Sequence, residues 1–564
     1  MANPQEMMAA ARQKLTAPGA SFEVRTEMIR GAPHHTFHHE IRVMADLYRD
    51  GLRHCDKPFL VNDDETLTFG EVYERAAGLA ARMHEAGIRP GDRVALCMRN
   101  YPEWIVTFMA CTGAGIICVP LNSWWKGEEI LFALQDCGAK MLFADGERLA
   151  ELAPVSNQLP AGMGLVGVRR GKDAPDGTIN WDEFCGDLRG HSFTNASRPD
   201  EDILIMYTSG STGRAKGVVS THQAVLSTVL SFDLGIATAR SVLPEAAVAA
   251  LPPPCMLVTV PLFHVTGCHT IFLASIRQGR KLVLMYQWNP EKALELIERE
   301  RVTAFMGVPT QSMELMNSPR FGDHDLSSLT SIRGGGAAMP AGQVNRIRQQ
   351  TGKMSTHGYG LTETNAMGSN IAGDAHVQRP SSVGQPMQPL VEIKIFDDDG
   401  REKAPGEDGE IWIRSPSNFR GYWGQDDTNA ALFRDGFFAT GDIGRFDDEG
   451  YLYITDRAKD IVIRGGENIG CAEVESAIHE DPAVAEAAVF GVPDERLGEV
   501  PVAVISLRPG RDTSSDAIHS ELKKHLAPFK IPDRILLRRD PLPRVASGKI
   551  FKKRLREEFI RSLS

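Results

Sequence analysis

Apolar and polar positions follow two alternating periods along most of the chain. Short apolar runs of strand length, such as Val94–Met98 and Lys281–Met285, stand next to segments 71–87 and 290–302, where apolar residues recur every three to four positions. This order is typical of parallel strands that are connected by helices. It predicts an α/β fold with mostly parallel, helix-covered sheets over about the first 440 residues.

The pattern changes beyond Phe446. Short, turn-rich strands follow, then a helix around Ala472–His479, two more apolar strands and a basic amphipathic end. We expect a separate α+β domain of roughly 100 residues there, which is an ordinary domain size. The charged stretch 456–460 is the expected joint. We therefore place a large domain at 1–456, a hinge at 457–459 and a small domain at 460–564.

Composition and charge narrow the class of protein. A chain of 564 residues exceeds one ordinary core, and its 42% hydrophobic and 24% charged residues are typical of a globular protein. The formal net charge of −11 gives no basic field for nucleic acid. Nine scattered cysteines without a CxxC pair indicate reduced core residues and no zinc site, so we expect a cytoplasmic protein.

One uncharged stretch, 104–125, has the length of a membrane span. Gly113, Gly115 and Pro120 divide it, which favours a buried helix, a turn and a short strand. The first residues also lack the apolar region of a signal peptide. We therefore expect no transmembrane span.

The loop 206–222, MYTSGSTGRAKGVVSTH, combines glycines, hydroxyls and a lysine. It joins an apolar strand at 203–206 to a second extended run that begins at 217–219, and we expect a helix to start near His222. Glycines let the backbone approach an anion, and hydroxyls with a lysine suit a polyphosphate. A Walker A loop is excluded, because Ala215 and Gly217 stand where it needs glycine and a hydroxyl residue. By itself the loop favours phosphate binding only modestly over a flexible polar linker.

Four further motifs follow in order: HGYGLTET at 357–364, TGD at 440–442, DRAKDIVIRGGENI at 456–469 and PRVASGKI at 543–550. Together with the loop they resemble the adenylate-forming superfamily of acyl-CoA synthetases, peptide-synthetase adenylation domains and beetle luciferases, over about residues 66–556. The resemblance implies a smaller barrel-like part in the large domain and a mobile C-terminal domain. It also implies that a carboxylate attacks ATP to give acyl-AMP and pyrophosphate, and that a thiol then takes the acyl group.

The resemblance also assigns ATP contacts. Tyr359 stacks on adenine beside Gly360, Thr362 contacts the α-phosphate, Glu363 holds Mg²⁺, and Asp442 binds the ribose. The structural alternatives are a core aromatic for Tyr359, a helix-start carboxylate for Glu363 and a surface ion pair for Asp442. The phosphate loop contributes Thr208, Ser209, Gly210, Ser211, Thr212, Gly213 and Lys216. The backbone beneath adenine and the acyl carbonyl contributes Gly335, Gly336, Ala337 and Ala338, and Arg457 makes the second ribose or phosphate contact.

The C-terminal motifs carry the catalytic lysine and the thiol path. Lys549 corresponds to the ammonium between the attacking carboxylate and the α-phosphate, where charge develops in the transition state. The alternative is one more cation on a solvated basic helix. Lys459 corresponds to the hinge residue, and Gly466 to the glycine that lines the pantetheine tunnel of coenzyme A. Simple turn residues are the alternative for both.

The acid is less well defined. His264, in PLFHVTG, corresponds to the mouth of the acyl pocket, or it is a structural histidine. Residues 365–368 contain no basic group for a second carboxylate, so we expect a hydrophobic monocarboxylic acid. A medium- or long-chain fatty acid is the first expectation, and an aryl or steroid-type acid the alternative. The long segment 236–256 is a candidate apolar lip.

The chain ends without room for a carrier domain, so free coenzyme A is the expected acceptor. An enzyme that loads a separate carrier protein is one alternative, and a degenerate binding or scaffold protein is another. The latter predicts loss of the charged set, yet Lys216, Glu363, Asp442, Arg457 and Lys549 are all present. The oligomeric state stays open, a homodimer included.

Overall fold

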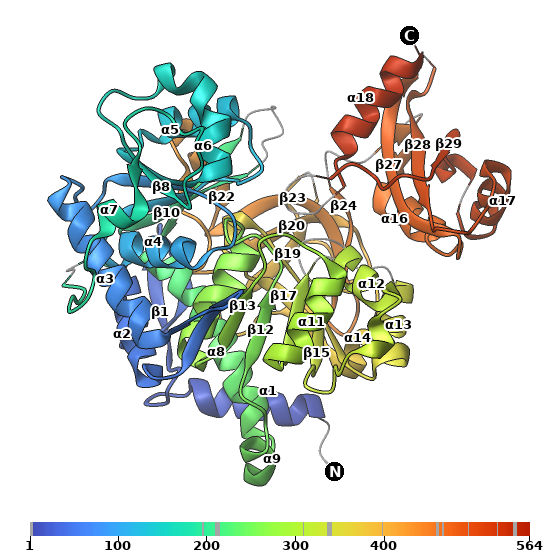
Figure 1. Cartoon of the computed structure of the whole chain (residues 1–564). Coiled ribbons are helices and arrows are strands. Elements are labelled where there is room, and N and C mark those ends of the chain that lie inside the picture. Colours follow the sequence, from blue (N-terminus) through green and yellow to red (C-terminus); the bar gives the residue numbers. More distant parts are fainter. Residues whose placement is uncertain are drawn as a thin grey trace.

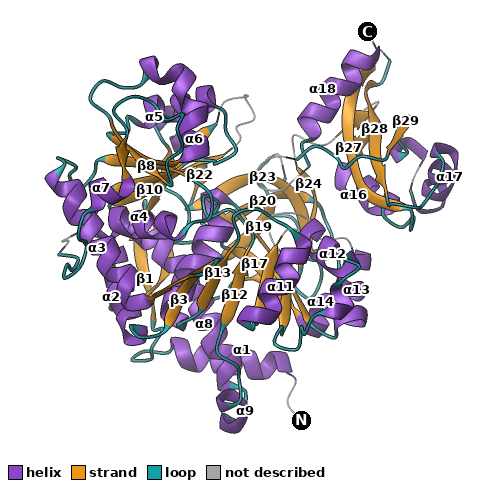
Figure 2. Ribbon diagram, viewed as in Figure 1, coloured by secondary structure: helices purple, strands orange, loops and turns teal. Residues whose placement is uncertain are grey.

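The structure, a computed structural model, consists of a large N-terminal body and a smaller C-terminal body beside it (Figure 1). It describes residues 4–194, 197–208, 215–307, 309–334, 341–397, 399–457, 462–464, 467–494, 496–526, 528–544 and 550–563. Helices lie outside and between the sheets of the large body (Figure 2). The fold class predicted from the sequence is confirmed.

An eight-stranded sheet forms the first half of the large body. Its strands are parallel from β10 to β9, whereas β11 and β21 are antiparallel. Helices α3 and α4 cover one face, and α5 and α6 cover the other. The strands in spatial order are β21 (Gly421–Tyr422), β11 (Lys216–Thr221), β10 (Asp202–Thr208), β6 (Ile117–Pro120), β5 (Arg93–Cys97), β7 (Met141–Asp145), β8 (Gly164–Val168) and β9 (Ile179–Asn180). The helices are α3 (Phe69–Glu85), α4 (Pro102–Gly113), α5 (Gly127–Cys137), α6 (Gly146–Leu152) and α7 (Trp181–Cys185).

A nine-stranded sheet forms the second half, with β13, β12, β14, β15 and β16 parallel at its centre. The strands in spatial order are β18 (Gln385–Pro386), β17 (Gly368–Ala372), β16 (Met354–Gly360), β15 (Ser331–Gly334), β14 (Ala304–Gly307), β12 (Cys255–Val258), β13 (Lys281–Leu284), β3 (Pro58–Asn62) and β4 (Glu65–Thr68). Its inner face packs on α2 (Met44–Gly51), α8 (His222–Ser241), the π-helix η3 (Thr266–Leu273) and α10 (Ala274–Gln278). Its outer face packs on α11 (Pro290–Glu300), α12 (Pro309–Asn317), α13 (Ala341–Thr351) and α14 (Gly373–Gln378).

The largest core lies between these two sheets. Leu96 of β5 and Val258 of β12 belong to it, together with Val229 of α8 and Trp104 of α4. Because both sheets share this core, their strand ends keep a fixed relation to one another. The outer cores are smaller and separate.

A five-stranded antiparallel sheet is the smaller part of the large body. It contains β19 (Glu392–Phe396), β20 (Gly409–Arg414), β22 (Phe433–Arg434), β23 (Phe437–Phe446) and β24 (Leu452–Arg457). The N-terminal residues add α1 (Pro4–Thr16) and the hairpin β1 (Val24–Ile29) and β2 (Ala32–Phe37). The short helices α9 (Glu245–Ala249) and α15 (Asp426–Ala431) lie in connections, and α9 protrudes from the body (Figure 1).

The C-terminal body is an α+β unit with its own five-stranded sheet. Its strands are β25 (Val462–Arg464), β26 (Glu467–Ile469), β27 (Val484–Asp494), β28 (Gly498–Leu507) and β29 (Arg534–Arg538). Helices α16 (Cys471–Ile478) and α17 (Ser515–His525) pack on one face, and α18 (Lys552–Leu563) packs on the other. Strand β24 pairs within the large body and β25 within this sheet, so the chain passes between the two bodies after Arg457.

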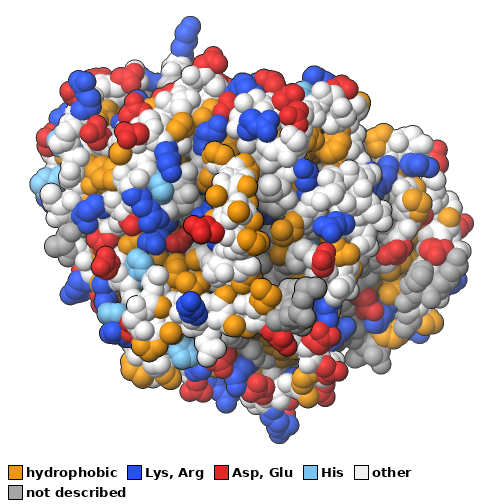
Figure 3. Space-filling model, turned by 90° about the horizontal axis from the view of Figure 1, so that it is seen from below, with side chains coloured by type: hydrophobic (Ala, Val, Ile, Leu, Met, Phe, Trp, Pro, Cys, Tyr) orange, Lys and Arg blue, Asp and Glu red, His pale blue; other side chains and the backbone are white. Residues whose placement is uncertain are grey.

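The uncharged stretch 104–125 folds into the elements that its glycines predict, namely α4, a turn and β6. Trp104 and Phe108 stack within the central core. Among the residues that the structure describes, no helix combines the length and apolarity that a bilayer crossing requires. The surface seen from below α9 carries charges of both signs interspersed with apolar side chains (Figure 3).

His222 connects α8 to α2 inside the core. The backbone N–H of Met44 donates to His222 Nδ1 at 3.1 Å, and His222 is fully buried. Burial lowers the pKa of His222 to about 4 from its ordinary 6.5. The imidazole is therefore neutral at physiological pH, and its protonation would remove the acceptor that Met44 uses.

This burial predicts a loss of stability in acid. In the unfolded chain His222 is protonated below about pH 6.5, whereas in the folded chain it is protonated only below about pH 4. The unfolded state therefore binds more protons between these values, and the free energy of unfolding falls as the pH falls through that window. We expect His222→Asn, whose amide oxygen can accept the Met44 N–H, to reduce the loss between about pH 7.5 and about pH 5 by roughly 2 kcal/mol. Urea unfolding at both pH values measures it. His35→Asn, at an exposed position, is the control; equal pH slopes for both variants would contradict the assignment.

Candidate active site

Four parallel strands of the nine-stranded sheet end at one edge. Strands β12, β14, β15 and β16 run in register, so the segments that follow Val258, Gly307, Gly334 and Gly360 leave the sheet side by side. In open α/β sheets, ligands bind beyond the carboxyl ends of the strands. The motifs predicted to bind ATP and the acid follow these strand ends.

The predicted phosphate loop is the tip of a hairpin in the other large sheet. Thr208 ends β10 and pairs with Lys216, the first residue of β11. The strand–loop–strand–helix order predicted from the sequence is confirmed, because α8 begins at His222 directly after β11. The residues between the two strands that were predicted to wrap the phosphates, Ser209, Gly210, Ser211, Thr212 and Gly213, lie outside the described residues.

The segment after β16 forms a tight turn that presents Glu363. Residues Thr362–Thr364 make one 3₁₀ turn, and Asn365 and Ala366 follow with positive φ angles of 51° and 69°. A Cβ on Gly360 would lie 2.5 Å from the carbonyl oxygen of Ala366, so only glycine fits at the start of this turn. The N–H of Phe419 donates to the Glu363 carbonyl at 2.7 Å. The position of Glu363 is thus fixed by its backbone.

Two of the residues 365–368, which the sequence places along the acyl pocket, are buried, whereas Ala366 is half-buried. Asn365 is 1% exposed and donates from Nδ2 to the Ser417 carbonyl at 2.7 Å. Its own carbonyl accepts the Thr228 hydroxyl at 3.0 Å, and Met367 is fully buried. The lack of a basic group at these positions therefore says little about the acid.

Tyr422 connects the hairpin of β10 and β11 to Glu363, and the sequence did not predict this role. Its hydroxyl donates to Glu363 Oε1 at 2.9 Å, and Lys216 Nζ lies 5.0 Å from the centre of its ring. Strand β21 brings it there, because Tyr422 pairs with Val218 of β11. Burial, followed by the charge of Glu363, raises the pKa of Tyr422, so the phenol stays protonated and able to donate.

Tyr359 and Asp442 form a second contact of this site. The Tyr359 hydroxyl donates to Asp442 Oδ2 at 2.7 Å, and Asp442 is 4% exposed. The backbone N–H of Asp442 donates to Thr440 Oγ1 at 3.1 Å. Asp442 also pairs with Arg457 across β23 and β24. Two residues predicted for adenine and ribose, 83 positions apart, therefore come into contact.

His264 lies on the segment that follows β12. It is half-buried beside the ring of Phe263, with ring centres 4.4 Å apart. Asn100 fixes this segment, because its amide donates to the Val260 carbonyl at 3.2 Å and accepts the Leu262 N–H at 2.9 Å. The structure brings His264 to the same strand edge as the Glu363 turn.

Several predicted residues cannot be placed. Residues Gly335, Gly336, Ala337, Ala338, Lys459, Gly466 and Lys549 lie outside the described residues, as does the side chain of Arg457. Of the predicted set, Thr208, Lys216, Tyr359, Gly360, Thr362, Glu363, Asp442 and His264 are described.

The donor set around Glu363 suits a metal that relies on substrate oxygens. Within the described ranges, no group of three or more histidine, cysteine, aspartate or glutamate side chains could hold a metal ion. Mg²⁺ is commonly held by one or two carboxylates together with substrate phosphates. One carboxylate at the strand edge, opposite a phosphate-type hairpin, fits that arrangement.

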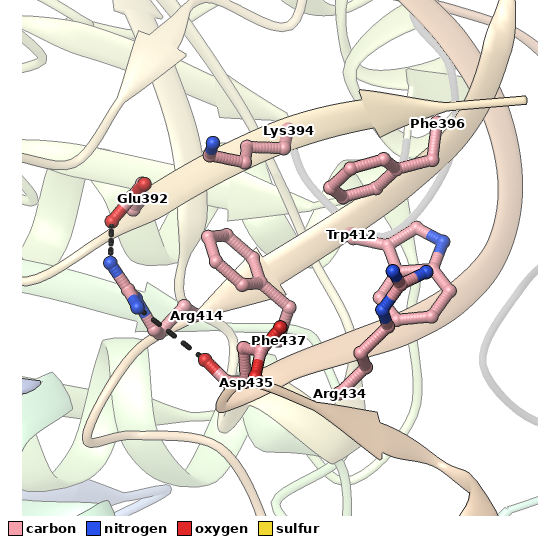
Figure 4. Close-up of a pocket in the computed structure, with 8 residues that line it drawn as sticks. All are labelled: Glu392, Lys394, Phe396, Trp412, Arg414, Arg434, Asp435 and Phe437. Carbon is pink, nitrogen blue, oxygen red and sulfur yellow. Dashed lines mark hydrogen bonds and ion pairs between the residues drawn. The ribbon is translucent and has the colours of Figure 1, made fainter. Parts of the chain in front are cut away.

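A surface hollow elsewhere does not belong to the site. It lies on the five-stranded sheet, where Arg414 bridges Glu392 and the carbonyl of Asp435 (Figure 4). The aromatic rings of Phe396, Trp412 and Phe437 form its wall (Figure 4). None of the predicted ATP or acid residues lines it.

Comparison with known families decides the class. The model of the AMP-binding enzyme family matches residues 47–423, and that of the AMP-binding enzyme C-terminal domain matches residues 473–549. The chain belongs to the AMP-binding enzyme family. The predicted resemblance to adenylate-forming enzymes is confirmed, and so is the reaction class, an AMP-forming acid–thiol ligase.

The curated relatives act on varied acids. A feruloyl-CoA synthase of Amycolatopsis sp is 36% identical over 500 residues, covering 87% of this chain and 94% of its own. A long-chain-fatty-acid–CoA ligase of Bacillus subtilis is 32% identical, covering 90% and 92%. A 3-[(3aS,4S,7aS)-7a-methyl-1,5-dioxo-octahydro-1H-inden-4-yl]propanoyl:CoA ligase of Mycobacterium tuberculosis is 36% identical, covering 89% and 96%.

A solved structure agrees over nearly the whole chain. The anthranilate CoA ligase in complex with anthranoyl-AMP matches with a TM-score of 0.82 and 26% identity, covering 93% of this chain and 98% of its own. Similarity at this level includes both bodies. ATP and coenzyme A are thus consistent with the family to which the chain belongs.

The contact between Tyr422 and Glu363 yields a prediction. Tyr422→Phe removes one donor to Glu363 and, by the usual worth of a hydrogen bond to a charged group, should slow acid-dependent ATP–pyrophosphate exchange by about 10-fold or more. The loss should appear mainly as a higher KM for ATP with magnesium. Tyr453→Phe, which removes a tyrosine–carboxylate bond to Asp447 on the surface, is the matched control. Equal effects of the two variants would exclude a role for Tyr422 in the site.

Proposed function

We propose that this protein is an ATP-dependent acid:CoA ligase for a hydrophobic carboxylic acid. In the first step a carboxylate oxygen of the acid attacks the α-phosphorus of ATP, and pyrophosphate leaves. In the second step the thiolate of coenzyme A attacks the carbonyl carbon of acyl-AMP, and AMP leaves. The contact set of Lys216, Tyr422 and Glu363 at the strand edge is the observation that supports the proposal most directly.

Each described residue has a part in this scheme. Lys216 and Thr208, with the hairpin residues 209–213, would bind the β- and γ-phosphates that become pyrophosphate. Thr362 would contact the α-phosphate, and Glu363 would hold Mg²⁺, which neutralises phosphate charge when bound. Tyr422 donates to Glu363 and so orients that carboxylate.

The nucleoside end would lie by Tyr359 and Asp442. Their hydrogen bond fixes the ring of Tyr359 relative to the Asp442 carboxylate, which is a strong acceptor for ribose hydroxyls. Arg457 would make the second ribose or phosphate contact. The glycine-rich segment 335–338 would lie beneath adenine and the acyl carbonyl.

We assign the two half-reactions to two positions of the C-terminal domain. The large domain would span 1–456, the hinge 457–459 with Lys459, and the small domain 460–564. Lys549 would stabilise the charge that develops in adenylation, and Gly466 would line the path of coenzyme A after rotation. The break between the sheets after Arg457 supports this division.

For the acid, ring-containing substrates are favoured over long unbranched chains. Feruloyl-CoA synthase and the fused-ring propanoyl:CoA ligase are each 36% identical to this chain, and the fatty-acid ligase is 32% identical. Loading of a separate carrier protein is the second candidate, because the same adenylate serves it. A scaffold protein without activity is disfavoured by the complete charged set.

A screen tests the function directly. Pyrophosphate release is measured with ATP, magnesium, coenzyme A and a panel of aryl, fused-ring and straight-chain acids, and acyl-CoA is identified by mass. We expect release that depends on both the acid and coenzyme A. Adenylate formation with transfer only to a holo-carrier protein would favour the second candidate, and no adenylate with any acid would refute the proposal.

Lys549→Ala separates the half-reactions. Because the ammonium acts on charge that develops only during adenylation, we expect the variant to lose acyl-AMP formation by about 100-fold or more and to keep thioester formation from supplied acyl-AMP. Single-turnover assays of each step measure this. Lys553→Ala, an exposed cation on α18, is the control. A parallel loss of both steps in Lys549→Ala would refute the assignment.

A further inference from the structure

The inner face of the nine-stranded sheet is accessible in an otherwise buried region. Met306, Arg333 and Thr356 are direct neighbours across β14, β15 and β16, and all three are only half-buried. Their sequence neighbours Phe305 and Ile332, which face the outer helices, are fully buried. Because the inner face is covered by η3 and α8, this alternation indicates an open space between the sheet and those helices.

Helix η3 and the strand edge border this space. The Thr270 hydroxyl lies 3.5 Å from Met306 Sδ, and Thr259 Oγ1 donates to the Met306 carbonyl at 3.1 Å. Gly358 and Gly360, which share the face of Thr356 on β16, are also half-buried. The space therefore runs along the sheet to the edge where Glu363 and His264 lie, and it suits the chain or ring of the acid.

Arg333 brings a positive charge into this space. Its Nε donates to Ser331 Oγ at 3.3 Å, and in the described part of the chain no carboxylate forms an ion pair with it. Burial lowers the pKa of its guanidinium. A guanidinium carries five N–H donors, so most of them remain available to a ligand.

Arg280 adds a second cation behind the first. It is 6% exposed and extends from the start of β13 to Met256 Sδ at 3.9 Å. Its guanidinium also donates to the side chain of Gln278. Burial, followed by the positive charge of Arg333, lowers its pKa to about 9.

The acidic side chains of this region already form ion pairs with other cations. Arg277 binds Asp233 at 2.7 Å and Asp50 at 3.5 Å, and Lys281 binds Glu300 at 2.9 Å. None of these carboxylates forms an ion pair with Arg333 or Arg280, although the charge of Asp233 acts on Arg280. An oxygen-bearing ligand would satisfy donors that the protein itself leaves open.

The position of Arg333 fixes the length of such a ligand. Arg333 is one residue before the end of β15, and its Nε reaches back to Ser331, three residues before Gly334, which places the guanidinium about 10 Å below the strand edge at 3.3 Å per residue. A carboxylate activated at the edge would have its far end near the guanidinium. A chain of about eight carbons or a fused ring system spans such a distance.

We propose that Arg333 recognises an oxygen acceptor at the far end of the acid, either a second carboxylate or a ketone. The inference rests on the proposed function, because it takes the space along β14, β15 and β16 as the acyl pocket. It changes the expected substrate from a plain hydrocarbon acid to one with polar groups at both ends.

Binding of three matched acids tests the inference. Octanoic, 7-oxooctanoic and octanedioic acid have equal chain lengths and differ only at the far end. We expect calorimetry on the full chain, with a non-hydrolysable ATP analogue present, to give at least about tenfold tighter binding of one or both oxygen-bearing acids, as expected for a hydrogen bond to a charged donor. The acid that binds tighter tells whether the group is a carboxylate or a ketone.

Variants assign the preference to the arginine. Arg333→Met should abolish the preference and leave or improve octanoic acid binding, whereas Arg333→Lys should retain part of it. Arg401→Met, on an exposed turn, is the control and should change nothing. Equal affinities in the unaltered protein, no binding of any of the three acids, or an equal loss for all three in Arg333→Met would each overturn the inference.

Turnover is measured separately on the same acids. A preference in binding without pyrophosphate release from any acid would count against the proposed function and leave the recognition by Arg333 standing. Turnover of all three acids with equal kcat/KM would overturn the inference and leave the ligase function standing.

Discussion

The hydroxyl of Tyr422 connects the two sheets on which the active site depends. Lys216 begins a strand of the eight-stranded sheet, and Glu363 follows the last parallel strand of the nine-stranded sheet. The hydroxyl of Tyr422 reaches the carboxylate of Glu363, and its ring lies beneath the Lys216 ammonium. The phosphate clasp and the metal-binding carboxylate that we propose for Lys216 and Glu363 would serve one reaction only if their relative position is fixed. The shared core between the sheets sets that position coarsely, and Tyr422 sets it locally.

Local signals in the sequence predicted the local structure well. The glycines and proline of 104–125 correctly divided that stretch into α4 and β6, because turn-forming residues act on the backbone where they stand. The strand before the phosphate loop and the helix after it were predicted for the same reason. Tyr422 was missed because its partner is 59 residues away and the two meet only through the pairing of β21 with β11. No periodicity in the sequence carries that information.

The acyl pocket shows the same limit more sharply. Residues 365–368 were taken for pocket wall because they follow the Glu363 motif, yet Asn365 and Met367 are buried structural residues. Arg333 follows an apolar residue in the short strand SIRG, where a lone charge ordinarily indicates a solvent-facing position. Its side chain instead faces the interior, since both faces of this central strand are covered by helices. Only the stacking of layers reveals that a charged position is enclosed.

The selectivity of such a pocket would come from a penalty rather than from added attraction. Burying a hydrocarbon chain gains about 0.8 kcal/mol per methylene whichever group ends it. A purely apolar end displaces the solvent that reaches Arg333 and leaves charged donors unsatisfied, which costs about 1–3 kcal/mol for each group, as much as about one to four methylenes contribute. An acid with an oxygen at that end avoids the cost. Discrimination between acids of equal length would therefore depend on the hydrogen bonds that the guanidinium loses when solvent is displaced. Apolar contacts along β14 and η3 would set the overall affinity.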